Sequence, residues 1–198
     1  MRDKRIAAKI DSALSMAAWE GDTETVKALI AAGADVHAHT DAPLWSAALG
    51  GRTDTMRALL DAGADQDIAL LEAAANGLVE LVTELLANGA DANVCEGLPL
   101  RMAAIHGHTE TVKVFLGAGA DFYSDCALFN AAGEGHTDTV RALLKAGAYG
   151  RPAARREAEK NGHAETVRVL KNWRTRGRAG SPLRPRKRRR RCVAVPGE

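Results

Sequence analysis

Two apolar segments alternate along most of the chain. The first reads SALSMAAWEG where it first occurs, and its later copies keep a leucine three positions before a pair of alanines. This spacing places the leucine and the alanines on one face of a short helix. The second segment, for example TETVKVFLGA at 109–118, carries Val112, Phe115 and Leu116 at positions i, i+3 and i+4. The pattern therefore predicts pairs of short amphipathic helices.

The helix pair recurs along the chain at a nearly constant period. The stretch GHTETVKVFLGAGAD has five relatives, the last of them diverged, and the six copies begin at Gly21, Gly51, Gly77, Gly107, Gly135 and Gly162. Successive copies are 30, 26, 30, 28 and 27 residues apart. Helices of about eight to ten residues are not stable alone in water, so each pair must be held by its neighbours. We therefore expect an all-α solenoid of stacked helix-turn-helix units.

The repeats predict one solenoid over residues 1–173, with units near 12–41, 42–67, 68–97, 98–125, 126–150 and 151–173. Residues 1–12 are charged, and Ile6 and Ile10 are spaced to extend the apolar stripe that contains Leu14. In the last unit Arg155 occupies the leucine position, which gives the end of the stack a polar surface. Both ends are therefore expected to act as caps.

Glycines and prolines fit the ends of the predicted helices. A glycine follows each of five second helices, where it accommodates a left-handed backbone, at Gly33, Gly63, Gly89, Gly119 and Gly147. Pro43 and Pro99 fall where a first helix begins, and a proline at that position loses no hydrogen bond. Trp45 and Phe129 directly follow the leucine of their repeats, and we expect them to serve packing.

The motifs APLWSAA and LPLRMAA, followed downstream by GHTETVKVFLGAGAD, resemble the ankyrin repeat, whose pattern is T-P-L-H-x-A, a second helix and G-A-D. The resemblance extends roughly from Ser12 to Trp173. It implies binding of other proteins through a concave face and protruding β-hairpin fingers. The repeats here are shorter than the usual 33 residues, and only 7 positions separate Gly63 from Leu70. That link is too short for a full finger, so we expect the concave face to dominate binding.

The resemblance also points to the two positions after each alanine pair, which the family directs into its concave groove. The predicted partner-binding residues are Trp19, Glu20, Leu49, Asn76, Ile105, His106 and Glu134. Among them Trp19, Leu49 and Ile105 carry the apolar weight expected of anchors. The alternative is that Trp19 and Leu49 only cover the edge of the first two repeats.

Residue patterns for other chemistry are weak. His108, His136 and His163 follow the first glycine of their repeats, which indicates separate structural loops. His37 and His39 have metal-ligand spacing, but a third strong ligand is missing, so we expect neither a metal nor a cofactor. The sequence contains no G-x-S-x-G, G-x-x-x-x-G-K-[ST] or H-E-x-x-H motif. We expect a protein that is not an enzyme.

Composition is that of an ordinary soluble chain, with 46% hydrophobic and 26% charged residues. The N-terminus lacks the apolar core of a secretory signal, and no window approaches the roughly 20 apolar residues of a membrane span. Cys95, Cys126 and Cys192 are far apart and form no C-x-x-C pair. These features predict a cytoplasmic monomer, nuclear if it is made in or delivered to a eukaryotic cell.

The formal net charge of +2 hides two oppositely charged parts. Residues 1–173 contain 17 basic and 24 acidic side chains, a net of −7, and residues 174–198 contain 10 basic and 1 acidic, a net of +9. Because the tail has few apolar residues and repels itself, we expect it to be disordered. The opposite charges also predict that the tail associates with its own repeats at low salt.

The basic tail leaves several functions open. Its densest basic residues are Arg184, Arg186, Lys187, Arg188, Arg189, Arg190 and Arg191. Such a run is typical of weak non-specific binding to nucleic acid, of a nuclear import signal or of contact with an anionic membrane, and also of a solvated or incidental end. No aromatic residue is interleaved for base stacking. The alternative to a protein-binding module is thus a nucleic-acid-binding or nuclear-targeted, effector-like protein that acts through this tail.

Overall fold

The computed structural model of the chain describes residues 2–120 and 124–173, so the predicted tail lies outside the described residues. Within these ranges the chain forms twelve α-helices and no strand. In chain order they are α1 (Arg2–Glu20), α2 (Thr23–Ala31), α3 (Ala38–Leu49), α4 (Thr53–Asp61), α5 (Gln66–Ala75), α6 (Val79–Ala87), α7 (Val94–Ile105), α8 (Thr109–Gly117), α9 (Ser124–Gly133), α10 (Thr137–Lys145), α11 (Arg151–Lys160) and α12 (Ala164–Asn172). The all-α prediction is confirmed.

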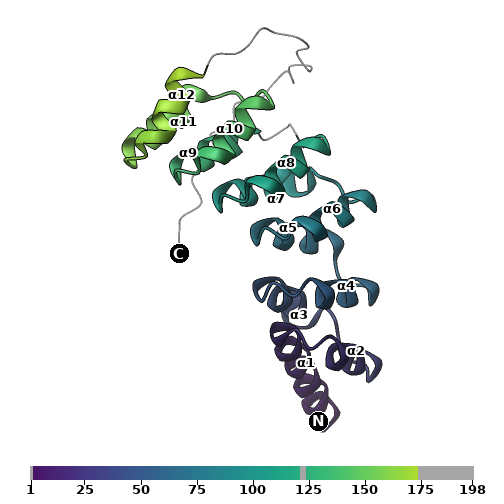
Figure 1. Ribbon diagram of the computed structural model, residues 1–198. Coiled ribbons are helices and arrows are strands. Elements are labelled where there is room, and N and C mark those ends of the chain that lie inside the picture. The colour runs from purple at the N-terminus through teal and green to yellow at the C-terminus, as the bar shows by residue number, and fades with distance from the viewer. Residues whose placement is uncertain (1, 121–123, 174–198) are drawn as a thin grey trace.

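The helices are arranged in two rows (Figure 1). Each odd-numbered helix packs against the next odd-numbered helix and against the even-numbered helix that follows it. The odd-numbered helices form an inner row, and the even-numbered helices line one side of it as an outer row. The result is an elongated stack with α1 and α2 at one end and α11 and α12 at the other. This is the α-solenoid that the repeats predict.

The core follows the leucine and alanine positions of the repeats. Leu44, Ala47 and Ala48 are fully buried, and the equivalent residues of the neighbouring repeats are buried in the same way. Alanine has a small side chain, so adjacent inner helices can approach closely. Val112 and Phe115 close the core from the outer row. Burial of these apolar side chains in each pair depends on the next pair, which explains why single repeats are unstable.

The outer helices end in the left-handed turns expected from the sequence. Gly119 has a φ of 87°, and the other four predicted glycines also have positive φ values. After α8, the N–H of Ala120 donates to the carbonyl of Phe115 and the N–H of Gly119 donates to that of Leu116. These two bonds form a Schellman motif, which satisfies carbonyls left free at the end of the helix.

Left-handed turns also precede the prolines of the inner row. The first turns of α3 and α7 each contain three consecutive residues with positive φ, which are His39, Thr40, Asp41, Cys95, Glu96 and Gly97. Their φ values lie between 48° and 74°. Right-handed helix resumes immediately after them, next to Pro43 and Pro99. The prolines therefore lie at the start of the regular part of each helix, as expected.

Two packing expectations are wrong. Ile6 is 53% exposed, because α1 extends as one helix beyond the first repeat and its N-terminal turns have no neighbour to cover them; Ile10 does pack against the core. Trp45 is 52% exposed. Its side chain interacts with Glu72 of α5 near the surface instead of filling the space between the repeats. Phe129, the other residue expected to pack, is partly buried.

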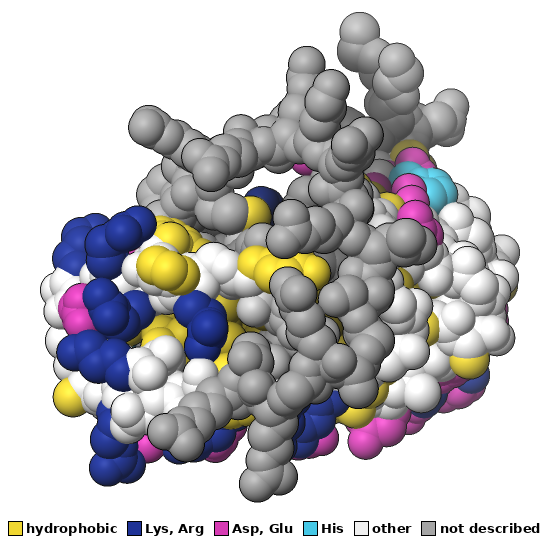
Figure 2. All heavy atoms as spheres, turned by 90° about the horizontal axis from the view of Figure 1, so that it is seen from above, with side chains coloured by type: hydrophobic (Ala, Val, Ile, Leu, Met, Phe, Trp, Pro, Cys, Tyr) yellow, Lys and Arg dark blue, Asp and Glu magenta, His cyan; other side chains and the backbone are white. Residues whose placement is uncertain are grey.

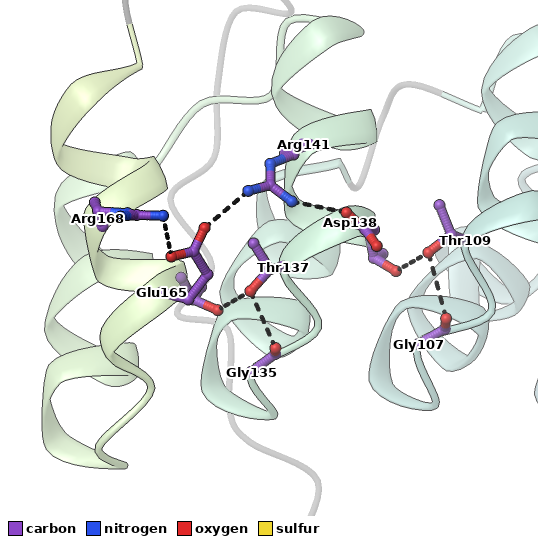
Figure 3. Close-up of polar contacts among 10 residues, drawn as sticks. Gly107, Thr109, Gly135, Thr137, Asp138, Arg141, Glu165 and Arg168 are labelled. Atoms are coloured by element: carbon purple, nitrogen blue, oxygen red, sulfur yellow. Dashed lines mark hydrogen bonds and ion pairs between the residues drawn. The ribbon is translucent and has the colours of Figure 1, made fainter.

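Threonine pairs join several neighbouring repeats through their hydroxyl groups. The hydroxyl oxygens of Thr23 and Thr55 lie 2.9 Å apart. Those of Thr109 and Thr139 lie 2.8 Å apart, and those of Thr137 and Thr166 lie 2.7 Å apart (Figure 3). The third repeat has Val79 and Leu81 at the two threonine positions, which interrupts the series. As a result the hydroxyl of Thr111 is buried without a hydrogen-bond partner.

A second series of bonds runs from the residue before each outer helix to a carbonyl of the preceding repeat. Arg52 Nε donates to Trp19 O at 3.2 Å, His108 Nε2 donates to Ala75 O at 2.9 Å, and His136 Nε2 donates to Ile105 O at 2.7 Å. The loop histidines His108 and His136 are thus structural. Their rings also require a glycine beneath them, since a Cβ at Gly107 would lie 2.5 Å from the His136 ring.

The junction between the second and third repeats lacks both kinds of bond. Leu78 occupies the position of the bridging histidines, and it offers no donor to the carbonyl of Leu49. In the outer row, α4 and α6 are not close neighbours, unlike the other successive outer helices. An ion pair of 2.7 Å between Arg57 and Glu84 connects them. This junction therefore has neither a threonine pair nor a bridging side chain to a carbonyl, and the ion pair between Arg57 and Glu84 and the interaction between Trp45 and Glu72 cross it instead.

Candidate protein-interaction face

The predicted partner-binding residues lie at the ends of the inner helices. Each buried alanine pair is followed by two residues in the last helical turn or at the C-cap. The helix turns by about 100° per residue, so these two positions leave the buried face. They are thereby free to contact a molecule beside the inner row.

The structure places the seven predicted residues in different environments. Trp19 is 53% exposed and Leu49 is 45% exposed, whereas Ile105 is partly buried. Asn76 is also partly buried, and its side-chain amide donates to the carbonyl of Glu72 at 2.9 Å. The remaining three, Glu20, His106 and Glu134, are exposed. Among the predicted residues, the exposed apolar surface therefore lies on the first two repeats.

Two exposed apolar residues were missed by the sequence interpretation. Met16 is 65% exposed and Trp45 is 52% exposed. Met16 precedes Trp19 by three positions and Trp45 precedes Leu49 by four, which are the spacings of residues on one helix face. Helical periodicity applied to Trp19 and Leu49 would have found both. We call the surface formed by Met16, Trp19, Trp45 and Leu49 the tryptophan face.

A carboxylate accompanies each tryptophan. Glu20 follows Trp19 directly and is exposed. Glu72 of α5 is partly buried, and this burial raises its pKa above the ordinary value of 4.5, while the interaction with the Trp45 side chain partly opposes the rise. A buried carboxylate without a cation is under-compensated, so a cation near Glu72 would be favoured. The tryptophan face therefore combines aromatic surface with negative charge.

Charge is distributed unequally along the stack. The first three repeats, residues 12–97, contain 3 basic and 14 acidic side chains, a net of −11. The last three, residues 98–173, contain 10 basic and 8 acidic side chains, a net of +2. Figure 2 shows Lys and Arg side chains gathered at the end of the molecule that α11 and α12 form. The tryptophan face thus lies in the acidic half.

The pair of histidines with metal-ligand spacing forms a local contact. His37 Nδ1 lies 2.6 Å from the carboxylate of Asp41, and this hydrogen bond raises the pKa of His37 above 6.5. Among the described residues, no three His, Cys, Asp or Glu side chains come close enough together to hold a metal ion. The contact connects the two ends of the left-handed turn in α3, which gives it a structural role.

Comparisons with known proteins agree with this architecture. A family model for ankyrin repeats (3 copies) matches residues 4–69 and 70–152, which is well over half of the chain. The crystal structure of the human ASB11 ankyrin repeat domain is similar, with a TM-score of 0.70 and 25% sequence identity over 83% of this chain and 86% of that one. A search of curated proteins found no match. In the part of the chain that the structure describes, no helix combines the length and apolar character needed to cross a membrane.

Proposed function

The chain belongs to the ankyrin-repeat family, and from this premise we propose that it binds a partner protein through the concave side of its inner helices, without catalysis. Ankyrin repeats are generally protein–protein interaction modules. The observation that supports a particular surface is the tryptophan face, where four large apolar side chains are between 45% and 65% exposed. Exposed apolar residues that cluster in this way are typical of binding anchors.

The proposed anchor set differs from the one expected from the sequence. Ile105 is partly buried and loses less exposed surface on binding than Trp19 or Leu49 would. The anchors are therefore Trp19 and Leu49, supported by Met16 and Trp45. Glu20, Asn76, His106 and Glu134 contribute polar contacts at the edge, where individual side chains matter less for affinity.

The test begins with a photo-crosslinking amino acid placed at Trp19. The control position is Tyr149, which is 55% exposed and lies between α10 and α11, near the other end of the stack. A partner captured through position 19 but not through position 149 is then purified. Trp19→Ala combined with Leu49→Ala should weaken its binding by more than about 2 kcal/mol without changing the melting temperature much. Tyr149→Ala should bind normally. Full-strength binding by the double variant would refute the proposal.

The alternative function, through the basic tail, is supported by the sequence run from Arg184 to Arg191 alone. It predicts that deletion of residues 174–198 abolishes activity, whereas partner binding through the inner row survives that deletion. If the tail is a nuclear import signal, the same deletion should leave the protein in the cytoplasm of a eukaryotic cell, whereas the full chain should enter the nucleus. Electrostatic binding to nucleic acid would also fall steeply between low and physiological salt.

A further inference from the structure

We propose that the tryptophan face and the acidic surface around it form a docking site for an arginine-rich peptide, and that its occupant is residues 184–191 of the same chain. The inference rests on the proposed function, because it uses the same surface. It adds the chemistry of the ligand and identifies a competitor that any partner protein must displace.

The face has the groups that recognise guanidinium. Arginine stacks on aromatic rings and forms paired hydrogen bonds with carboxylates, and tryptophan is the strongest aromatic partner for a cation. Trp19 and Trp45 each expose about half of their surface on adjacent inner helices. Glu20 lies next to Trp19 in sequence, and Glu72 interacts with Trp45. An arginine side chain at this position can satisfy both the ring and the carboxylate.

The charge around the face is not neutralised within the first three repeats. Residues 12–97 contain three basic side chains. Lys27 pairs with Glu24 at 3.0 Å, Arg52 donates to the carbonyl of Trp19, and Arg57 pairs with Asp54 and Glu84. All three are already engaged, and with the four basic residues at the start of α1 included, residues 1–97 contain 7 basic and 16 acidic side chains, a net of −9. A cationic peptide is the ligand that this field attracts.

The surface of the last three repeats, at the end of which Trp173 lies, differs in charge from that of the first three. The last three repeats carry a net of +2, and Arg156 and Lys160 lie on α11, the last inner helix. Like charges there oppose docking of the tail beside α11. The acidic residues of the first three repeats lie mostly on the outer helices and loops, and the inner row adds Asp67 and Glu72 of α5, Asp41 of α3 and Glu20 of α1. Electrostatics therefore directs the tail toward the tryptophan face.

The chain is long enough to reach it. From α11 to α3 the inner row has four helix-to-helix steps of about 8–10 Å, or about 32–40 Å in all. Eleven residues, 174–184, can extend over about 36–40 Å. Residues 184–191 then span about a further 26 Å, which is enough to cross α5 and α3. The segment can therefore occupy the face of its own molecule.

The experiment compares the full chain with a full-length variant in which residues 186–191 are all changed to glutamine. The probe is a synthetic peptide with the sequence RPRKRRRR, and tryptophan fluorescence reports its binding. We expect the peptide to bind the glutamine variant at least about 10-fold more tightly than the wild type, whose own tail occupies the face. In the glutamine variant, Trp45→Ala or Glu72→Gln should weaken peptide binding by about 5-fold or more, and Tyr149→Ala should not change it.

A second peptide, with every arginine replaced by lysine, separates stacking from charge. It should bind several-fold more weakly at the same net charge, because lysine lacks the planar guanidinium. Equal affinity of the arginine peptide for the wild type and the glutamine variant would overturn the proposed occupant. Binding that does not depend on Trp45 or Glu72 would overturn the proposed site. Tail-dependent dimerisation in sedimentation would show that a second copy supplies the segment, contrary to the proposal.

Peptide binding and partner binding can fail independently, so the two proposals are tested separately. If the peptide does not bind but the Trp19→Ala, Leu49→Ala variant loses its protein partner, the interaction module stands and only the peptide inference fails. If the peptide binds and the double variant keeps full affinity for the partner, the protein docks elsewhere. Circular dichroism of each variant confirms that the fold is intact.

Discussion

At the scale of single residues, Val79 stands where other repeats have a threonine, and it leaves a buried hydroxyl of the next repeat without a hydrogen bond. The hydroxyls of Thr111 and Thr139 are both fully buried at equivalent positions of neighbouring repeats. Thr139 shares a hydrogen bond with Thr109, but Thr111 faces the position of Val79 and has no partner. A buried polar group without a hydrogen bond costs roughly 1–3 kcal/mol. The two threonines should therefore respond oppositely to the same mutation.

Thr111→Val removes an unsatisfied hydroxyl, and we expect it to raise the free energy of unfolding by about 1 kcal/mol. Thr139→Val removes a satisfied hydroxyl and leaves Thr109 unpaired, and we expect a decrease of about 1 kcal/mol. Urea denaturation of the two variants and the wild type measures both changes. A shift of the same sign in both variants would contradict this account of the threonine series.

The contact between His37 and Asp41 predicts a pH dependence. The hydrogen bond raises the pKa of His37 in the folded state above 6.5, so the folded state binds the proton more tightly than the unfolded state does. Its contribution to stability is complete below pH 6.5 and is lost as the pH rises through the folded pKa. Thermal melts at several pH values should show this loss in the wild type. His37→Gln and Asp41→Asn should each remove it, and a slope that persists in both would exclude the pair as its source.

At the scale of the helical element, the ends of the outer helices depend on backbone conformation more than on packing. Gly119 has a φ of 87°, and a Cβ there would meet nothing within 4 Å. Gly117, two residues earlier, lies inside α8, and a Cβ there would also be in open space. The two glycines therefore differ in conformation and not in room for a side chain.

Gly119→Val should lower the free energy of unfolding by at least about 1 kcal/mol, because a side chain destabilises the left-handed conformation. Gly117→Ala should raise it by about 0.5–1 kcal/mol, because alanine has the higher helix propensity. Differential scanning calorimetry of both variants checks the pair. Equal destabilisation would indicate that side-chain space, not φ, sets the requirement for glycine.

The sequence predicted much at this scale, and particular residues explain where it stopped. The leucine, alanine and glycine positions repeat in register, so helix pairs, their buried faces and the turns at Gly33 or Gly119 follow from periodicity. The left-handed turn at His39, Thr40 and Asp41 was not predicted. Non-glycine residues rarely adopt positive φ, so none of these three residues indicates such a turn in the sequence. The exposure of Trp45 was missed for a related reason. Trp45 interacts with Glu72 of another repeat, and no pattern within one repeat reports such a contact.

At the scale of the whole molecule, the junction between the second and third repeats divides the stack. The threonine pairs and the histidine bridges are both missing there, and in solenoids stability depends on such nearest-neighbour terms. Opening at this junction separates α1–α4, which carry the tryptophan face, from α5–α12. Local opening of this kind requires less free energy than global unfolding.

Hydrogen exchange should therefore be faster in α1–α4 than in α7–α10 under native conditions. Leu78→His introduces the donor that His108 and His136 provide in later repeats, and we expect it to slow exchange in α1–α4 by about 5-fold, equivalent to about 1 kcal/mol. Leu78→Ala loses packing without adding a donor, and exchange there should become faster. Uniform exchange rates along the stack would argue against a division at this junction.

The position of that junction also has a consequence for biosynthesis. The threonine pairs and the bonds from Arg52, His108 and His136 join residues 29 to 33 positions apart, so each unit is stabilised as soon as its neighbour has been synthesised. The uninterrupted series of bonds, however, belongs to the last three repeats, which leave the ribosome after the first three. A solenoid nucleates where its interfaces are strongest and then propagates. The nascent N-terminal repeats should consequently emerge before their nucleus exists, with the exposed tryptophans accessible to chaperones, and the stack should complete its folding from its C-terminal half backward.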